Sequence, residues 1–178
     1  MSNRLIEKQL IYSGRKIQLE VHRLEAENGS LTEREVCVHP GAVVVLAFLN
    51  DERILLIRNT RYAVGQTLIE LPAGTLEKGE DPMNCAGREL LEETGYLAGK
   101  LKRIGSFYSS PGVLSEKLHA FAAYDLQERH TALEEGEEIE LLPSTFEEAV
   151  EMIRTGEICD SKTISTLLMY DRFHQTGK

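Results

Sequence analysis

The chain has 178 residues and a mass of 20.0 kDa, the size of one ordinary domain, which argues against two. Its hydrophobic content of 42% and charged content of 28% are those of a globular protein rather than a disordered one. The net charge of −9 argues against a nucleic-acid surface, because phosphate backbones are bound by clustered lysine and arginine.

Cysteine usage and hydropathy indicate the cellular compartment in which the protein is expected. Cys37, Cys85 and Cys159 are odd in number and show no Cys-x-x-Cys spacing, so neither a disulfide framework nor a zinc site is expected. The longest apolar run, Ala42 to Leu49, is far shorter than the ~20 residues that a membrane helix needs. The amino terminus has no secretory pattern. We therefore expect a soluble, unprocessed cytoplasmic protein with no membrane partner.

The first part of the chain has the pattern of β-strands. Apolar residues alternate with polar ones from Ile17 to Val21, Asn28-Gly29 predicts a two-residue turn, and Glu33 to Val38 would return as the second arm of an antiparallel hairpin. The arms of such a hairpin either project from the rest of the protein or pair with a partner chain. The continuous apolar run from Ala42 to Leu49 predicts a central strand that is buried on both faces.

Helical signals follow after Pro72. A helix is expected from Pro82 to Thr94, with Asp81 as its N-cap and Gly95 as its stop. The order of strands, helix, strands and helices predicts an α/β fold of the α+β kind, with a mixed sheet covered by helices on both faces. The other expected elements are strands at 54–57, 67–71, 101–107, 117–124 and 139–142 and helices at 145–154 and 162–173.

Three carboxylates gather on one side of the expected helix. Glu89 and Glu93 are four residues apart and Glu92 is three from Glu89, so all three side chains can converge. Carboxylates this close repel each other unless a cation compensates, and hard oxygen ligands suit Mg²⁺ or Mn²⁺. The alternative is a solvated acidic face, the commoner reading for a bare pair of glutamates.

Residues 74–96 match the Nudix box, Gly-x5-Glu-x7-Arg-Glu-U-x-Glu-Glu-x-Gly-U, in which U is a bulky apolar residue. The matching positions are Gly74, Glu80, Arg88, Glu89, Leu90, Glu92, Glu93, Gly95 and Tyr96, of which the aromatic Tyr96 is the one loose fit. Chance agreement at the seven fixed positions is on the order of 10⁻⁸ for average composition. The chain thus resembles the Nudix hydrolase family. This resemblance implies an α/β/α sandwich and cleavage of a nucleoside diphosphate linked to another group.

The resemblance also implies roles for the box residues. Glu89, Glu92 and Glu93 would be metal ligands, with Glu92 and Glu93 counted as catalytic, and the backbone carbonyl of Ala73 would be a further ligand. Divalent metals neutralise diphosphate oxygens and supply hydroxide near neutral pH, and we expect Mg²⁺ here, with Mn²⁺ as the alternative. The structural positions of the box would hold loop and helix together: Gly74, Glu80, Arg88 and Gly95.

Segments on both sides of the box resemble the ADP-ribose pyrophosphatase branch of the family. Pro111 follows the end of the box by fifteen residues, as in that branch, and residues 116–121, 58–61 and 68–74 also look like it. Pro111-Gly112 is in addition simply a good turn sequence. The resemblance nevertheless counts Pro111 and Gly112 as part of the substrate site.

The same segments offer further substrate contacts. Arg61, with Arg34 as a second candidate, would pair with the substrate's phosphates, because guanidinium groups bind phosphate in a bidentate manner. Glu70 would accept hydrogen bonds from adenine or ribose. Tyr62 or Tyr12 would serve for stacking on the base, and nothing in the sequence selects one of them.

A dense acidic stretch runs from Glu134 to Glu140. By itself it predicts a solvated loop. In the family branch a loop here brings in a catalytic glutamate from outside the box, and Glu137 aligns best with that role, with Glu135 and Glu138 as alternatives. Together with residues 74–96 this stretch accounts for the whole net charge of −9, so the acidity is concentrated where a metal would bind.

The resemblance therefore implies Mg²⁺-dependent hydrolysis of ADP-ribose to AMP and ribose 5-phosphate. The amino-terminal strands of this branch commonly exchange between subunits, so we expect a homodimer with residues 1–40 as its arm and 41–178 as the hydrolase part. The alternatives are another nucleoside diphosphate derivative (an ADP-sugar, GDP-mannose, FAD or a dinucleotide) and a non-catalytic ADP-ribose sensor. A sensor would predict a damaged box or an added DNA-binding module, and neither is seen.

Overall fold

The computed structural model describes residues 3–130 and 138–174 of the chain. Its contacts divide the chain into two compact units, one of residues 1–41 with 108–117 and one of residues 42–107 with 118–178. Each unit is described by itself. The first unit takes in residues 108–117, which the sequence pattern places with the hydrolase part.

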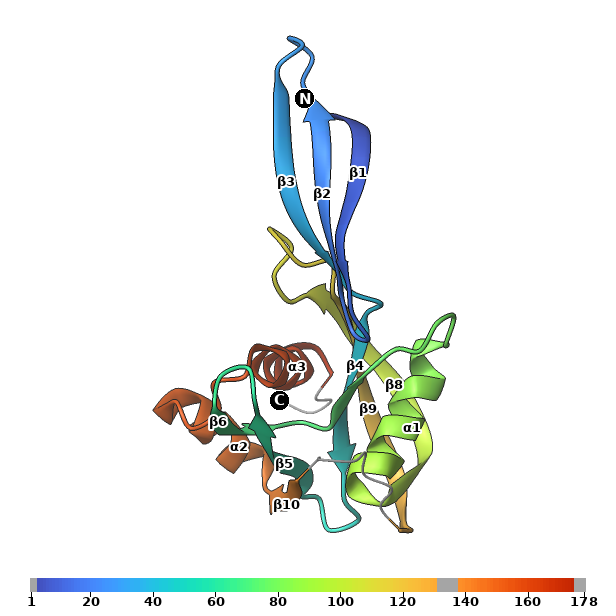
Figure 1. The fold of residues 1–178 in the computed structure, drawn as a ribbon. Coiled ribbons are helices and arrows are strands. Elements are labelled where there is room, and N and C mark those ends of the chain that lie inside the picture. Colours follow the sequence, from blue (N-terminus) through green and yellow to red (C-terminus); the bar gives the residue numbers. More distant parts are fainter. Residues whose placement is uncertain (1–2, 131–137, 175–178) are drawn as a thin grey trace. The chain divides into compact units, whose positions relative to one another are not determined.

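The first unit is built on a three-stranded antiparallel sheet (Figure 1). Its strands are β1 (Arg4–Ser13), β2 (Gln18–Glu25) and β3 (Leu31–Val38), in that order across the sheet. The sequence did not indicate β1, because its apolar residues come as the doublets Leu5-Ile6 and Leu10-Ile11 rather than in alternation. Register shifts in the pairing with β2 fall at these two doublets, so bulges accommodate the irregular pattern.

The hairpin of β2 and β3 is confirmed, but its predicted two-residue turn is wrong. The last paired residues are Glu25 and Leu31, so residues 26–30 form a five-residue connection. Within it Gly29 has a φ of 79°, and the amide of Ser30 donates to the side-chain oxygen of Asn28 (3.0 Å). Asn28-Gly29 thus lies in the turn, but the strands end before they reach it.

The second unit contains a seven-stranded mixed sheet. Its central strand, β4 (Ala42–Phe48), runs parallel to β9 and antiparallel to β5. The order is β10-β5-β4-β9-β8, with β6 paired to β5 and β7 paired to β4. The bounds of these strands are Ile54–Arg61 for β5, Gln66–Glu70 for β6, Ala73–Thr75 for β7, Tyr96–Tyr108 for β8, Lys117–Glu128 for β9 and Ile139–Ser144 for β10.

Helices cover both faces of this sheet, which confirms the predicted α/β/α sandwich (Figure 1). On one face Val43 and Val45 pack in a core that α1 (Pro82–Thr94) completes. On the other face Val44 and Leu46 pack in a core that includes residues of α2 (Phe146–Thr155) and α3 (Ser161–Phe173). Successive side chains of a strand point to opposite faces, and both faces of β4 are buried, which is why its sequence is apolar throughout.

The helices begin at capping residues. Asp81 accepts hydrogen bonds from two amides of the first turn of α1, and Gly95 ends that helix at a φ of 74°, as predicted. Thr145 and Glu148 form a capping box at α2. Asp160 caps α3, which begins one residue earlier than the sequence predicted.

Candidate active site

Arg88 joins the loop before α1 to the acidic face of that helix. Its Nε and Nη2 atoms donate to the two carboxylate oxygens of Glu80 (3.0 Å each). Its Nη1 atom donates to Glu89 (2.8 Å) and to Glu92 (2.9 Å). The hydrogen bond from Arg88 is the main reason that the pKa of Glu80 is lowered to about 2. One guanidinium thus fixes the loop and draws two box carboxylates together.

Gly74 leaves room for Glu89. A Cβ atom at residue 74 would overlap the carboxylate of Glu89, so with any other residue this carboxylate would have to move. The first glycine of the box thus leaves the space that the Glu89 carboxylate occupies.

Glu93 lies at the same junction. Its side chain is 5% exposed, and one of its oxygens accepts a hydrogen bond from the backbone amide of Ala73 (2.9 Å). Glu93 therefore fixes the start of β7 against the end of α1. The residues that the sequence predicts as metal ligands, Ala73, Glu89, Glu92 and Glu93, are carried by these two elements.

The carboxylates are engaged with protein groups in this arrangement. Within residues 3–130 and 138–174, no three His, Cys, Asp or Glu side chains stand so that they could hold a metal ion. The reason is visible in the contacts, because Arg88 binds Glu89 and Glu92 while Glu93 binds the amide of Ala73. The donor set still fits a hard divalent cation: all of its side-chain atoms are carboxylate oxygens, and a cationic group already bridges two of them.

Arg61 and Glu70 form a second charged cluster, at the end of β5 and β6. The Nε and Nη2 atoms of Arg61 donate to the two oxygens of Glu70 (2.9 and 2.5 Å). This bond is the main cause that raises the pKa of the guanidinium. Glu70 is 1% exposed, so in this arrangement its carboxylate is occupied by protein donors. Its predicted contact with adenine or ribose stays a prediction, as does the phosphate contact of Arg61.

Sequence reasoning missed the residues of α3 that complete this cluster. Lys162 donates to Glu70 (2.6 Å) and also pairs with Asp160 (3.0 Å). Lys162 and Glu70 are 92 residues apart in the chain. The local pattern Asp160 to Thr163 indicates the start of a helix, and no signal in it points to a distant carboxylate.

The other predicted substrate residues belong to the first unit. Arg34 is exposed on β3, and its side chain donates to the backbone carbonyl of Glu33 (2.9 Å). Pro111 and Gly112 are exposed in a turn that is closed by hydrogen bonds to the carbonyl of Ser110. Their contact with substrate stays a prediction. Glu137, the predicted catalytic glutamate, lies outside the described residues, as does Glu135.

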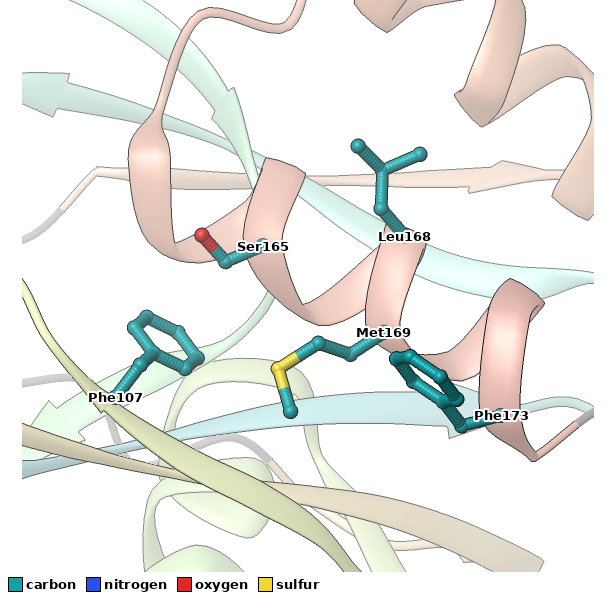
Figure 2. A pocket seen from close by; sticks show the side chains of 5 residues that line it. All are labelled: Phe107, Ser165, Leu168, Met169 and Phe173. Carbon is teal, nitrogen blue, oxygen red and sulfur yellow. The ribbon is translucent and has the colours of Figure 1, made fainter.

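A pocket of about 340 Å³ lies elsewhere in the second unit, between β8 and α3. Figure 2 shows that four of its lining side chains come from α3 and that Phe107 faces them from β8. None of the lining residues is charged, so this pocket lacks the groups that bind a diphosphate. The residues that line it are Phe107, Ser165, Leu168, Met169 and Phe173.

No helix in the described part of the chain is long and apolar enough to cross a membrane.

Known proteins resemble the chain over most of its length. An ADP-ribose pyrophosphatase of Bacillus subtilis is 42% identical over 92% of this chain and 89% of its own. A methanol dehydrogenase activator of Bacillus methanolicus is 40% identical over 89% of this chain and 87% of its own. A GDP-mannose pyrophosphatase of Escherichia coli is 40% identical over 71% of each chain. The relatives thus carry different names at similar identity.

The fold and the family agree. A solved structure described as an ADP compounds hydrolase superposes with a TM-score of 0.85, covering 96% of this chain and 93% of its own, at 20% identity, which supports the fold alone. The model of the NUDIX domain matches residues 38–164, a span that includes the paired loop, strand and helix around Arg88. Because this match covers more than half of the chain, and because a relative of 42% identity covers 92% of it, this chain belongs to the Nudix hydrolase family.

Proposed function

We propose that this chain hydrolyses ADP-ribose to AMP and ribose 5-phosphate in a metal-dependent reaction. The observation that carries the proposal is 42% identity over 92% of the chain to the Bacillus subtilis ADP-ribose pyrophosphatase, together with a box in which every charged position is present. Water attacks one of the two phosphorus atoms, the bond from that phosphorus to the bridging oxygen breaks, and a proton from the water passes to a base.

The family uses divalent metal ions, and we propose that Mg²⁺ acts here, with Mn²⁺ as the alternative. When bound, the ion neutralises phosphate oxygens and lowers the pKa of water. Glu89, Glu92, Glu93 and the carbonyl of Ala73 would hold it. Arg88 would then keep Glu80 as its partner, because that ion pair is bidentate and does not depend on the other carboxylates.

Two further groups of the chain act on the substrate in this proposal. Arg61 would bind a phosphate through the part of its guanidinium that Glu70 leaves open. Glu137 would accept the proton of the attacking water. In the first unit, Arg34, Pro111 and Gly112 would complete the substrate contacts, as the resemblance to the family branch implies.

The proposal is tested by assaying release of the nucleoside monophosphate, AMP or, from GDP-mannose, GMP, with purified protein across a panel of diphosphates. ADP-ribose is expected to give the highest kcat/KM, above an ADP-sugar, GDP-mannose, FAD and a dinucleotide. Activity should vanish after treatment with EDTA and return with Mg²⁺ or Mn²⁺. A preference for GDP-mannose would contradict the assignment of the substrate. Absence of hydrolysis with every compound, despite binding of ADP-ribose, would favour the non-catalytic sensor instead.

We also propose that the chain is a homodimer whose arm is formed by residues 1–40. Within the first unit β1 is exposed along its whole length. Its large apolar side chains Leu5, Ile6, Leu10, Ile11 and Tyr12 are 46–59% exposed. A row of such residues on one strand is unusual for a surface in water and suits an interface.

Light scattering after size-exclusion chromatography tests whether the protein is a dimer that forms through residues 1–40. Wild-type protein is expected at twice the mass of the 20.0 kDa chain, and Leu10→Glu with Ile11→Lys is expected to shift it to the monomer by placing charges in the interface. Exchange of two exposed residues of α2, Glu147→Lys with Glu151→Lys, serves as the control. A monomeric wild-type protein at micromolar concentration would contradict the proposal.

The cysteines support a reducing compartment, and we propose the cytoplasm. Cys37, Cys85 and Cys159 are all free thiols. Burial raises the pKa of Cys85 to about 12, so its thiol stays protonated near neutral pH.

A further inference from the structure

Lys162 is nearly buried beside the arginine that would bind phosphate. Its side chain is 15% exposed, and its Nζ atom lies 2.6 Å from Glu70 and 3.0 Å from Asp160. Lysine is among the residue types least often buried unless it is paired. Here both neighbours are carboxylates, which supply that pairing.

Glu70 connects Lys162 with Arg61. One of its oxygens, Oε2, accepts hydrogen bonds from both Lys162 and Arg61, while Oε1 accepts one from Arg61. A carboxylate as buried as this one is tolerated only when it is paired and hydrogen-bonded. Arg61 and Lys162 together pair this buried carboxylate, so neither cation has to supply all of its hydrogen bonds.

This sharing determines how Arg61 is presented. Glu70 holds the guanidinium along its Nε and Nη2 edge. Among the described residues no hydrogen bond is found for the remaining nitrogen, Nη1, and the side chain is 37% exposed. The guanidinium is therefore fixed on one edge and open to an anion on the other.

The start of α3 also anchors the backbone at this point. Thr163, which is fully buried, accepts a hydrogen bond from the amide of Leu71 (2.9 Å) and donates to Asp160 (2.6 Å). Asp160 in turn pairs with Lys162. The end of β6 is thus tied to α3 through both a side chain and a backbone group, two residues before Ala73.

We propose that Lys162 is a positioning residue, which acts through Glu70 to hold the Arg61 guanidinium in the orientation that binds the substrate's phosphates. The inference rests on the proposed function and deepens it. Without Lys162, Glu70 loses its tie to α3 and keeps Arg61 as its one cationic partner among the described residues. The bidentate pair of Glu70 and Arg61 would then no longer be held to α3 through Lys162, which weakens substrate binding and leaves the metal chemistry intact.

Lys162→Met removes the charge and keeps the length of the side chain. We expect KM to rise about 10-fold, with kcat within about 3-fold of wild type, because an interaction used for binding has been lost. Arg61→Ala is expected to raise KM at least as much. If Lys162 acts through Arg61, adding Lys162→Met to Arg61→Ala should change KM little further, because residues that work as one unit are not additive.

Two variants separate positioning from a general structural role. Lys162→Arg keeps a cationic donor and should restore KM to within about 3-fold of wild type. Lys100→Met, at an exposed position on β8, is the matched control and should leave KM, kcat and Tm unchanged. Melting curves accompany each assay. If Lys162→Met does not fold, Lys162→Gln, which keeps a hydrogen-bond donor without charge, is put through the same comparison.

The outcomes distinguish failure of the proposed substrate from failure of the proposed role of Lys162. The assays use whichever diphosphate the wild-type protein hydrolyses best, so a wrong substrate in the proposed function leaves the comparison of variants intact. An unchanged KM in Lys162→Met, or KM effects of Lys162→Met and Arg61→Ala that multiply in the double variant, would overturn the role of Lys162. A fall in kcat at constant KM would overturn it as well.

Discussion

Glu93→Gln should lower kcat by roughly 10³-fold, the scale of losing a group that acts directly on the reacting water or its cation. Glutamine has the same size and keeps an oxygen that can accept the hydrogen bond from the amide of Ala73. The contact between β7 and α1 should therefore survive. What is lost is one negative charge at a position that would bind the metal ion.

The same substitution should leave the melting temperature unchanged or raise it. Glu89, Glu92 and Glu93 lie on one side of α1, and their charges repel each other when no metal ion is bound. Removing one of them relieves that repulsion, and a gain in stability with a loss of activity is a common pattern at active sites. A thermal melt without added metal, run beside the assay of AMP release, measures both effects.

The control for this experiment is Glu147→Gln, in the exposed first turn of α2. It removes the same charge from a helix in the same unit and should change kcat little. If Glu93→Gln kept activity within a few-fold of wild type, Glu93 could be neither a metal ligand nor a catalytic group. The box would then depend on Glu89 and Glu92 for its chemistry.

Much of the box could be predicted from the sequence because its contacts are local. Arg88 reaches Glu92 within one turn of helix, and Glu80 is only eight residues away. The caps of α1 are likewise encoded by neighbours, Asp81 before the helix and Gly95 after it. Spacing along the chain is enough to place such residues, since a helix has a fixed period.

The missed features depend on distant parts of the chain. Lys162 meets Glu70 only because α3 packs on the face of the sheet opposite α1. The strand β1 was missed because bulges, which follow from its pairing with β2, break the alternation. β10 extends through Pro143 to Ser144, two residues beyond the predicted end at 142. An edge strand tolerates proline, and edge position is not visible in the sequence.

The acidic stretch before β10 contains the residue for which we expect the other large effect. Ile139, the first residue of β10, pairs with Asn59 on β5, two residues before Arg61. Glu137 precedes Ile139 by two residues. The first residue of β10 therefore lies beside the end of β5 that carries the arginine proposed to bind phosphate.

Glu137→Gln is expected to lower kcat by roughly 10²–10⁴-fold, since glutamine cannot accept the proton of the attacking water. Glu135→Gln and Glu138→Gln should each lose little, and Glu140→Gln, whose partner Arg58 lies 4.0 Å away at the surface, is the matched control. If the loss of kcat instead follows Glu135→Gln or Glu138→Gln, that glutamate is the base, and the alignment that favours Glu137 is wrong.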